Sequence, residues 1–91
     1  MLTTGSIISK NSGLLASSLD KEIVMMSVEN NEYYGLNKVG SRIWQIIETP
    51  TAVERIIDIM MKEYKIDRST CTADVMEYLN ELESKNLIRV S

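Results

Sequence analysis

The stretch that decides the fold is IVMMSVENNEYYGL, residues 23–36. β-Branched and aromatic residues, which favour strands, lie on both sides of Asn30 and Asn31. Asparagine tolerates the positive φ that a two-residue hairpin turn requires. The stretch therefore predicts an antiparallel hairpin, with Ile23–Val28 as its first strand and Tyr33–Leu36 as its second.

A two-residue turn also fixes the register of this hairpin, with Val28 opposite Tyr33 and Met25 opposite Leu36. Residues opposite each other share a face of the sheet. One face carries Ile23, Met25, Ser27, Tyr34 and Leu36, and the other carries Val24, Met26, Val28, Tyr33 and Gly35. A hairpin with one solvated face alternates apolar and polar residues, whereas both of these faces are largely apolar. We therefore expect each face to be covered.

The residues before the hairpin divide into a strand and an arm. Leu14–Leu19 predicts a further strand, joined to the hairpin by a turn at Asp20–Glu22. Residues 1–13 are rich in Ser, Thr, Gly and Asn and predict a loose N-terminal arm, with at most a short strand at Ser6–Ser9.

Three helices are predicted after the hairpin. Asn37 is the expected N-cap of the first, Lys38 to about Ile47. Gly40 lies one turn inside it and costs about 1 kcal/mol relative to alanine, which predicts a close packing contact there. The second helix is expected to open at Thr51, whose spacing to Glu54 matches a capping box.

The third helix is predicted from an N-cap at Thr72 to about Ser84. Its apolar stripe consists of Val75, Tyr78, Leu79 and Leu82. The last apolar residues, Leu87–Val90, are expected as a short strand or an extended tail on the core. One domain covering residues 1–91 is the simplest reading of this length.

The composition argues against several classes of function. The chain has 91 residues, a net charge of −3 and no histidine. No apolar stretch approaches the roughly 20 residues that a membrane span needs, and residues 1–10 lack a signal-peptide pattern, so we expect a cytoplasmic protein. The single cysteine, Cys71, excludes an intramolecular disulfide and is expected as a small residue just before the third helix.

The sequence shows no arrangement of residues typical of catalysis. Without histidine and with one cysteine, it offers no metal site, and its four glycines form no phosphate-binding loop. A nucleophile would lack a histidine base. We therefore predict that the protein is not an enzyme and has no catalytic residues, metal or cofactor.

Three helices with a β-hairpin also describe a winged-helix DNA-binding regulator, which remains the alternative from another class. In such proteins the third helix enters the major groove. Here that helix carries four acidic residues, Asp74, Glu77, Glu81 and Glu83, opposed only by Lys85. This charge would repel phosphate, so we expect no nucleic-acid partner.

The chain resembles the PqqD family, the stand-alone recognition element of ribosomally made, modified peptides. The resemblance covers about Ile23 to Ile88 and lies in the order and spacing of short features. These features are Leu36-Asn37, Gly40, Ile43-Trp44, Thr51-x-x-Glu54-x-Ile56, Asp74-Val75, Leu79, Leu82 and Asn86-Leu87-Ile88.

The resemblance implies an α+β fold that is winged-helix-like, with a three-stranded antiparallel sheet followed by a three-helix bundle. It also implies that the leader part of a precursor peptide adds as a strand to the open edge of the third strand and packs against the third helix. Carried over by position, the peptide-binding residues are Tyr33, Tyr34, Gly35 and Leu36 on the strand, and Asp74, Val75, Tyr78, Leu79 and Leu82 on the helix. On this helix we expect Val75, Leu79 and Leu82 to face the core. We expect the Tyr78 side of the helix, with Asp74, Glu81 and Lys85 just beyond Tyr78, to wall the groove; alternatively, Tyr78 is an ordinary residue at the core boundary.

Within the family, a short chain without a fused enzyme is most similar to the lasso-peptide type. The implied partners are then a precursor peptide, a separate leader peptidase and a cyclase or other modifying enzyme. The alternative is the pyrroloquinoline-quinone type, a peptide chaperone for a radical enzyme. An open strand edge and a loose arm also leave open a homodimer formed by strand exchange, or a module that only assembles with itself.

Overall fold

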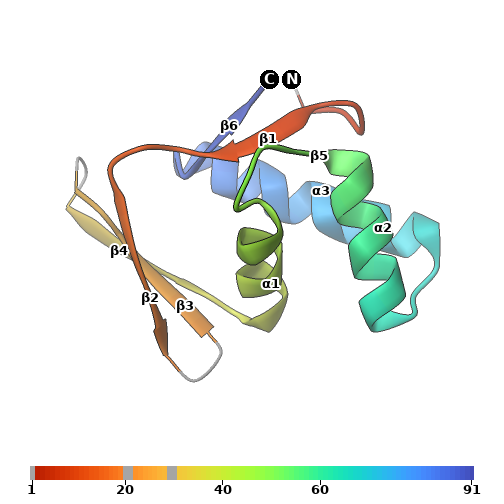
Figure 1. Cartoon of the computed structure of the whole chain (residues 1–91), viewed down its shortest axis with the longest axis horizontal. Helices are drawn as coiled ribbons and strands as arrows, with labels where there is room; N and C mark the ends of the chain where they lie inside the picture. Colours follow the sequence, from red (N-terminus) through yellow and green to blue (C-terminus); the bar gives the residue numbers. More distant parts are fainter. Residues whose placement is uncertain (1, 20–21, 29–30) are drawn as a thin grey trace.

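The computed structural model describes residues 2–19, 22–28 and 31–91. These residues form two three-stranded antiparallel sheets and three helices, which confirms the predicted α+β class (Figure 1). The elements in chain order are β1 (Ile7–Lys10), β2 (Leu14–Leu19), β3 (Glu22–Ser27), β4 (Glu32–Leu36), α1 (Lys38–Ile46), β5 (Thr51–Ala52), α2 (Val53–Tyr64), α3 (Arg68–Ser84) and β6 (Ile88–Val90).

The first sheet, called here the hairpin sheet, has the strand order β2-β3-β4. Its register differs from the prediction by two residues, because Ser27 pairs with Glu32, and Met25 pairs with Tyr34 rather than with Leu36. Asn31 has a φ of 56° and donates its N–H to the Ser27 carbonyl at 2.8 Å, so the connection between the strands is longer than two residues. Residues 20, 21, 29 and 30, and with them most of both predicted turns, lie outside the described residues.

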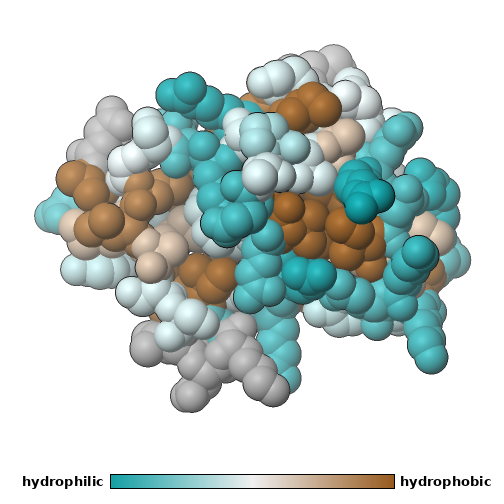
Figure 2. Space-filling view, viewed as in Figure 1, coloured by the Kyte–Doolittle hydropathy of each residue, from teal (hydrophilic) through white to brown (hydrophobic). Residues whose placement is uncertain are grey.

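A shift of two residues leaves every side chain on its predicted face, because side chains alternate with a period of two. The inner face lies against α1, and Met25, Ser27 and Leu36 are buried there. The outer face is open: Leu15 is 62%, Val28 56% and Tyr33 73% exposed. Hydrophobic surface gathers over this sheet, at the left of Figure 2. The expectation that both faces are covered therefore holds only for the inner face within the described chain.

The second sheet, called here the terminal sheet, has the order β5-β1-β6 and corrects the expectation of a loose arm. Ile8 of β1 is fully buried, and it faces Thr51 of β5 and Val90 of β6. The short strand expected at Ser6–Ser9 is present within one residue as β1, and the expected C-terminal strand is β6. The sheet was not foreseen because its strands lie far apart in the chain.

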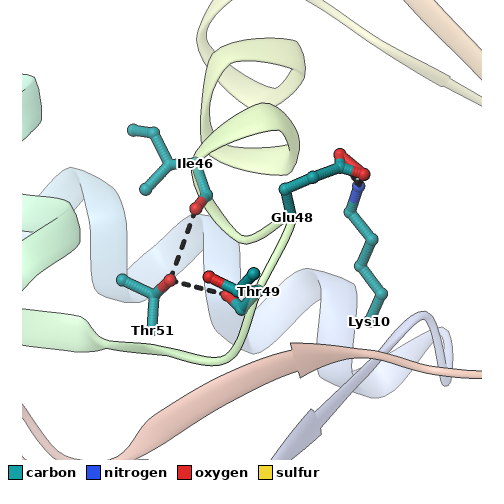
Figure 3. Close-up of polar contacts among 5 residues, drawn as sticks. All are labelled: Lys10, Ile46, Glu48, Thr49 and Thr51. Carbon is teal, nitrogen blue, oxygen red and sulfur yellow. Dashed lines mark hydrogen bonds and ion pairs between the residues drawn. The ribbon is translucent and has the colours of Figure 1, made fainter.

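Two of the three predicted helix starts are wrong. The Asn37 Oδ1 accepts the Gly40 N–H at 2.9 Å, which confirms the cap of α1. Thr51, by contrast, lies in β5, and its hydroxyl donates to the carbonyls of Ile46 and Thr49 (Figure 3). The predicted capping box is therefore absent, and α2 follows Ala52, which makes no side-chain cap.

The third helix starts earlier than predicted, at Arg68, with Asp67 rather than Thr72 as its N-cap. The Asp67 carboxylate accepts the Thr70 N–H at 3.0 Å and the Thr70 hydroxyl at 2.8 Å, and these bonds lower the pKa of Asp67. Cys71 therefore lies inside the helix rather than before it, with 1% of its surface exposed. Burial raises the pKa of its thiol.

A buried hydroxyl connects the hairpin sheet to α1. The Ser41 Oγ accepts the N–H of Ile23 at 2.9 Å and donates to the carbonyl of Leu36 at 3.1 Å. Ile23 and Leu36 face each other at the end of the β3–β4 ladder, so the hydroxyl bridges this last pair of strand residues. Ser41 is 2% exposed, and its helix position thus fixes where the hairpin meets α1.

We expect Ser41→Ala to lower the free energy of unfolding by about 1–3 kcal/mol, because it leaves a buried N–H and a buried carbonyl without their shared partner. Urea unfolding followed by tryptophan fluorescence measures this change. Ser84→Ala is the matched control, since it removes an exposed hydroxyl that bonds only its own helix. Equal stability of the two variants would contradict the role assigned to Ser41.

Candidate functional site

The hydrogen bonding of the hairpin sheet determines what its two edges present. In an antiparallel pair, successive residues alternately point both backbone groups at one neighbouring strand and away from it. The Val28 N–H donates to the Gly13 carbonyl at 3.1 Å, in step with the register that pairs Leu14 with Ser27. The even-numbered residues of β3 therefore point their backbone groups at β2, and the odd-numbered ones point theirs at β4.

The open edge of β4 follows from this alternation. Tyr34 and Leu36 lie opposite odd-numbered residues of β3, so their backbone groups point into the sheet. Tyr33 and Gly35 point their N–H and carbonyl groups outward, at the end of the strand order. The side-chain position at Gly35 has no neighbouring atom within 4 Å. This edge is thus accessible to a further strand.

A groove, called here the edge groove, lies between this strand edge and α3. Its main cavity has a volume of about 190 Å³, and a neighbouring hollow has a volume of about 310 Å³. The main cavity is lined by Tyr33, Tyr34, Gly35, Leu36, Tyr78, Glu81, Leu82, Lys85 and Leu87. The hollow is lined by Asn37, Val39, Asp74, Glu77, Tyr78 and Glu81. Because Tyr78 and Glu81 line both, the two form one groove along the helix.

The two ends of the edge groove differ in charge. At one end, the Lys85 Nζ lies 3.1 Å from the Glu81 carboxylate and 5.7 Å from the centre of the Tyr34 ring. At the other end lie the carboxylates of Asp74 and Glu77. The groove therefore has one cation at its β4 end and an acidic wall beyond Tyr78.

Tyr78 links α3 to the junction of β4 and α1. Its hydroxyl donates to the Asn37 Oδ1 at 3.0 Å, the same oxygen that caps α1. Its ring lies so close to Gly40 that a Cβ there would collide with the hydroxyl and ring carbons. This is the close contact predicted from Gly40. Burial raises the pKa of the Tyr78 hydroxyl above its ordinary value.

The predicted site residues fall into two groups. All four strand residues line the main cavity together with Tyr78 and Leu82, and Asp74 lines the hollow. Val75 and Leu79 are 2% and 0% exposed and line neither part of the groove, so they belong to the core beneath it.

Sequence reasoning left Asn37, Glu81, Lys85 and Leu87 out of the predicted site. Asn37 directly follows the predicted edge strand, but its pattern indicated only a helix cap. Glu81 and Lys85 lie one and two turns beyond Tyr78 on the same side of α3, where helical spacing predicted them, but they were not counted among the peptide-binding residues. Leu87 follows the helix, and no local pattern brings it to the groove.

Three features are absent from residues 2–19, 22–28 and 31–91. Within these ranges, no three metal-binding side chains come together. No buried side-chain nitrogen or oxygen is left without a hydrogen-bond partner. No helix is both long and apolar enough to cross a membrane.

Residues 22–88 match the family model described as coenzyme PQQ synthesis protein D (PqqD). Among solved structures, TbiB1 in complex with the TbiA(beta) leader peptide is 32% identical, with a TM-score of 0.84. The match covers 89% of this chain and 94% of TbiB1. No curated protein sequence matches this chain.

Two further solved structures share the fold at lower identity. A lasso peptide synthetase B1 complexed with its leader peptide is 15% identical, with a TM-score of 0.74 over 90% of this chain and 96% of its own. The PqqD truncation of Methylobacterium extorquens PqqCD, a stand-alone recognition element, is 16% identical. Its TM-score is also 0.74, over 91% of this chain and 88% of its own.

We expect Gly40→Ala to lower the free energy of unfolding by about 1–3 kcal/mol, because the new methyl group must displace Tyr78. In a Tyr78→Ala background the same change should be neutral or stabilising by up to about 1 kcal/mol, the helix preference for alanine over glycine. Urea unfolding of the parent chain, the two single variants and the double variant measures the coupling. Equal costs of Gly40→Ala in both backgrounds would contradict the contact.

Proposed function

The chain belongs to the PqqD family, and on that premise we propose that it binds the leader segment of a ribosomally synthesised precursor peptide by β-strand addition. The observation that carries this proposal is the open edge of β4, where Tyr33 and Gly35 present backbone groups beside a groove. Strand addition uses such an edge for affinity and neighbouring side-chain pockets for specificity. The leader complex of the 32% identical TbiB1 supports the same reading.

Binding by this mode divides into two contributions. The leader backbone pairs with the outward groups of Tyr33 and Gly35, and each such hydrogen bond contributes about 0.5–1.5 kcal/mol regardless of the leader sequence. Side chains on one face of the leader strand enter the main cavity, where Leu36, Tyr78 and Leu82 offer apolar contacts. The cavity, rather than the backbone, would therefore select the sequence of the peptide.

The charges of the edge groove would also orient the bound peptide. Lys85 favours an acidic leader residue at the β4 end, although Glu81 competes for the same ammonium group. The acidic wall of Asp74 and Glu77 favours a basic residue at the other end. The same acidic residues disfavour nucleic acid, so we propose peptide rather than DNA as the partner of α3.

We further propose that the protein is not itself catalytic and hands the bound leader to separate enzymes in the cytoplasm, where ribosomal precursors are made. Lasso-peptide maturation, with a leader peptidase and a cyclase as partners, is favoured because a lasso peptide synthetase B1 with the same fold is solved with its leader peptide bound. TbiB1, which is 32% identical to this chain, is also solved with a leader peptide bound. The pyrroloquinoline-quinone type, with a radical enzyme as partner, is the second candidate, since its solved relative is 16% identical.

We expect Gly35→Pro to weaken leader binding at least tenfold, because proline removes an outward N–H from the pairing edge without removing a bond to β3. Gly35→Ala is the matched control: it keeps the N–H, and its Cβ meets no atom within 4 Å, so it should bind like the parent. Calorimetry would use the TbiA(beta) leader peptide and, where a precursor peptide is encoded next to the gene for this chain, the leader of that precursor. Circular dichroism would check the fold of both variants, and parent-like binding by a folded Gly35→Pro would contradict strand addition at this edge.

Nuclear magnetic resonance titration with the same leader peptides locates the binding surface independently of mutation. We expect affinity in the micromolar range or tighter and amide shifts at residues 33–36 and along the Tyr78 side of α3. Shifts confined to α1 would contradict the proposed groove. Strong, salt-sensitive binding to generic duplex DNA would instead support the winged-helix alternative.

A further inference from the structure

In the part of the chain that the structure describes, the opposite edge of the hairpin sheet, β2, has no feature that protects it from pairing. Its sequence, LLASSL, contains no charge, proline or glycine, and residues 15–18 are all exposed. Natural proteins usually protect an edge strand by making it short or by adding charges, proline or a covering element. In the terminal sheet the edge strands β5 and β6 have only two and three residues. The six-residue β2 has none of these protections.

The Val28–Gly13 hydrogen bond also determines which residues of β2 point their backbone groups outward. Gly13, Leu15 and Ser17 point their backbone groups at β3. Leu14, Ala16 and Ser18 therefore point theirs away from the sheet. Three consecutive pairing positions are thus presented, with Ala16 at their centre.

We propose that β2 pairs antiparallel with β2 of a second copy of this chain, around a two-fold axis through Ala16. In this register, Ala16 faces its own counterpart, Leu14 faces Ser18, and Leu15 faces Ser17. Residues that face each other share a face of the sheet, as a continuous antiparallel sheet requires. The Leu14–Ser18 and Ala16–Ala16 pairs exchange both backbone hydrogen bonds.

Charge favours a second copy of the chain at this edge. The chain carries a net charge of −3, so two copies repel each other least where the surfaces that meet carry no charge. In a contact with two-fold symmetry, the same strand of both copies meets itself. Because β2 has no charged side chain, no like charges face each other across this contact. The residue at the axis, Ala16, is also the smallest in the strand.

The inner face beside β2 has room for a side chain of the incoming strand. A cavity of about 220 Å³ beside the edge is lined by Lys10, Ala16, Ser17, Ser18, Ile23, Trp44, Gln45 and Glu48. In the proposed register, Leu14 of the second copy comes to lie opposite Ser18, on the inner face beside this cavity. The two charged side chains at the cavity, Lys10 and Glu48, form an ion pair with each other at 3.1 Å (Figure 3). The Lys10 Nζ also lies 4.9 Å from the centre of the Trp44 ring.

Pairing through β2 would join two hairpin sheets into one continuous sheet whose outer strands are the two copies of β4. Both edge grooves would remain free. This inference does not rest on leader binding, and it requires no exchange of the N-terminal strand β1, which pairs within its own chain.

Cysteine cross-linking tests the proposed register directly. Two Ala16→Cys residues would face each other in a hydrogen-bonded pair with Cα atoms about 5.5 Å apart, within the range of a disulfide. The native Cys71 is buried and should not interfere. Ser18→Cys is the matched control, since its two copies would lie about 13 Å apart along the strands. Covalent dimers from Ala16→Cys but not from Ser18→Cys are expected; equal yields, or none from either, would overturn the register.

Charge substitutions at the same axis test whether the dimer exists without a cross-link. The parent chain should show a concentration-dependent dimer by analytical ultracentrifugation, whereas Ala16→Glu and Ala16→Lys should each be monomeric. An equal mixture of the two variants should restore the dimer, because opposite charges then meet at the axis. A parent chain that stays monomeric at all concentrations, or variants that dimerise like it, would overturn the proposal. Leader binding by each variant, measured in parallel, should be unchanged. A wrong dimer proposal can therefore be told apart from a wrong proposal of leader binding.

Discussion

The contact of Tyr78 with Gly40 and Asn37 is the constraint on which the edge groove depends. Because residue 40 has no Cβ, the Tyr78 ring can approach the first turn of α1, and the Asn37 oxygen that caps that turn also accepts the Tyr78 hydroxyl. Asn37 directly follows the last residue of β4, so α3 is held beside the strand by residues at the strand's own end. The width of the groove is therefore set by packing and does not need to be formed by the bound peptide.

The two edges of the hairpin sheet are chemically different, and this difference suggests a division of roles. At β4, a helix with charged and aromatic side chains lies beside the outward backbone groups, which suits a partner selected by sequence. At β2, the outward backbone groups lie on a strand without charged side chains, which suits pairing with β2 of a second copy. The proposed peptide contact and the proposed self-contact would thus use opposite edges of the same three strands.

Local patterns predicted the parts of the fold that depend on neighbouring residues. The faces of the hairpin were correct even though its register was not, because an error of two residues preserves the alternation of side chains. The terminal sheet was not predictable, since β1 is held by strands far along the chain. Both wrong helix starts came from threonines: Thr51 pairs in β5, and the carboxylate of Asp67 caps α3 before Thr72. On α3, Val75 and Leu79 were carried over as peptide-binding residues but were also expected to face the core, and both are buried there. The residues of β4 and Tyr78 do line the edge groove, whereas no local pattern predicts that Leu87 reaches it.

Amide hydrogen exchange with and without a bound leader peptide tests strand addition at β4 most directly. If the leader pairs with this edge, the Tyr33 and Gly35 amides gain protection on binding, because these two N–H groups point away from the sheet in the unbound chain. The outward amides of Ala16 and Ser18 on the opposite edge should exchange at the same rate in both states. Leader binding that leaves Tyr33 and Gly35 exchanging as before, or that protects Ala16 and Ser18 instead, would contradict the proposal.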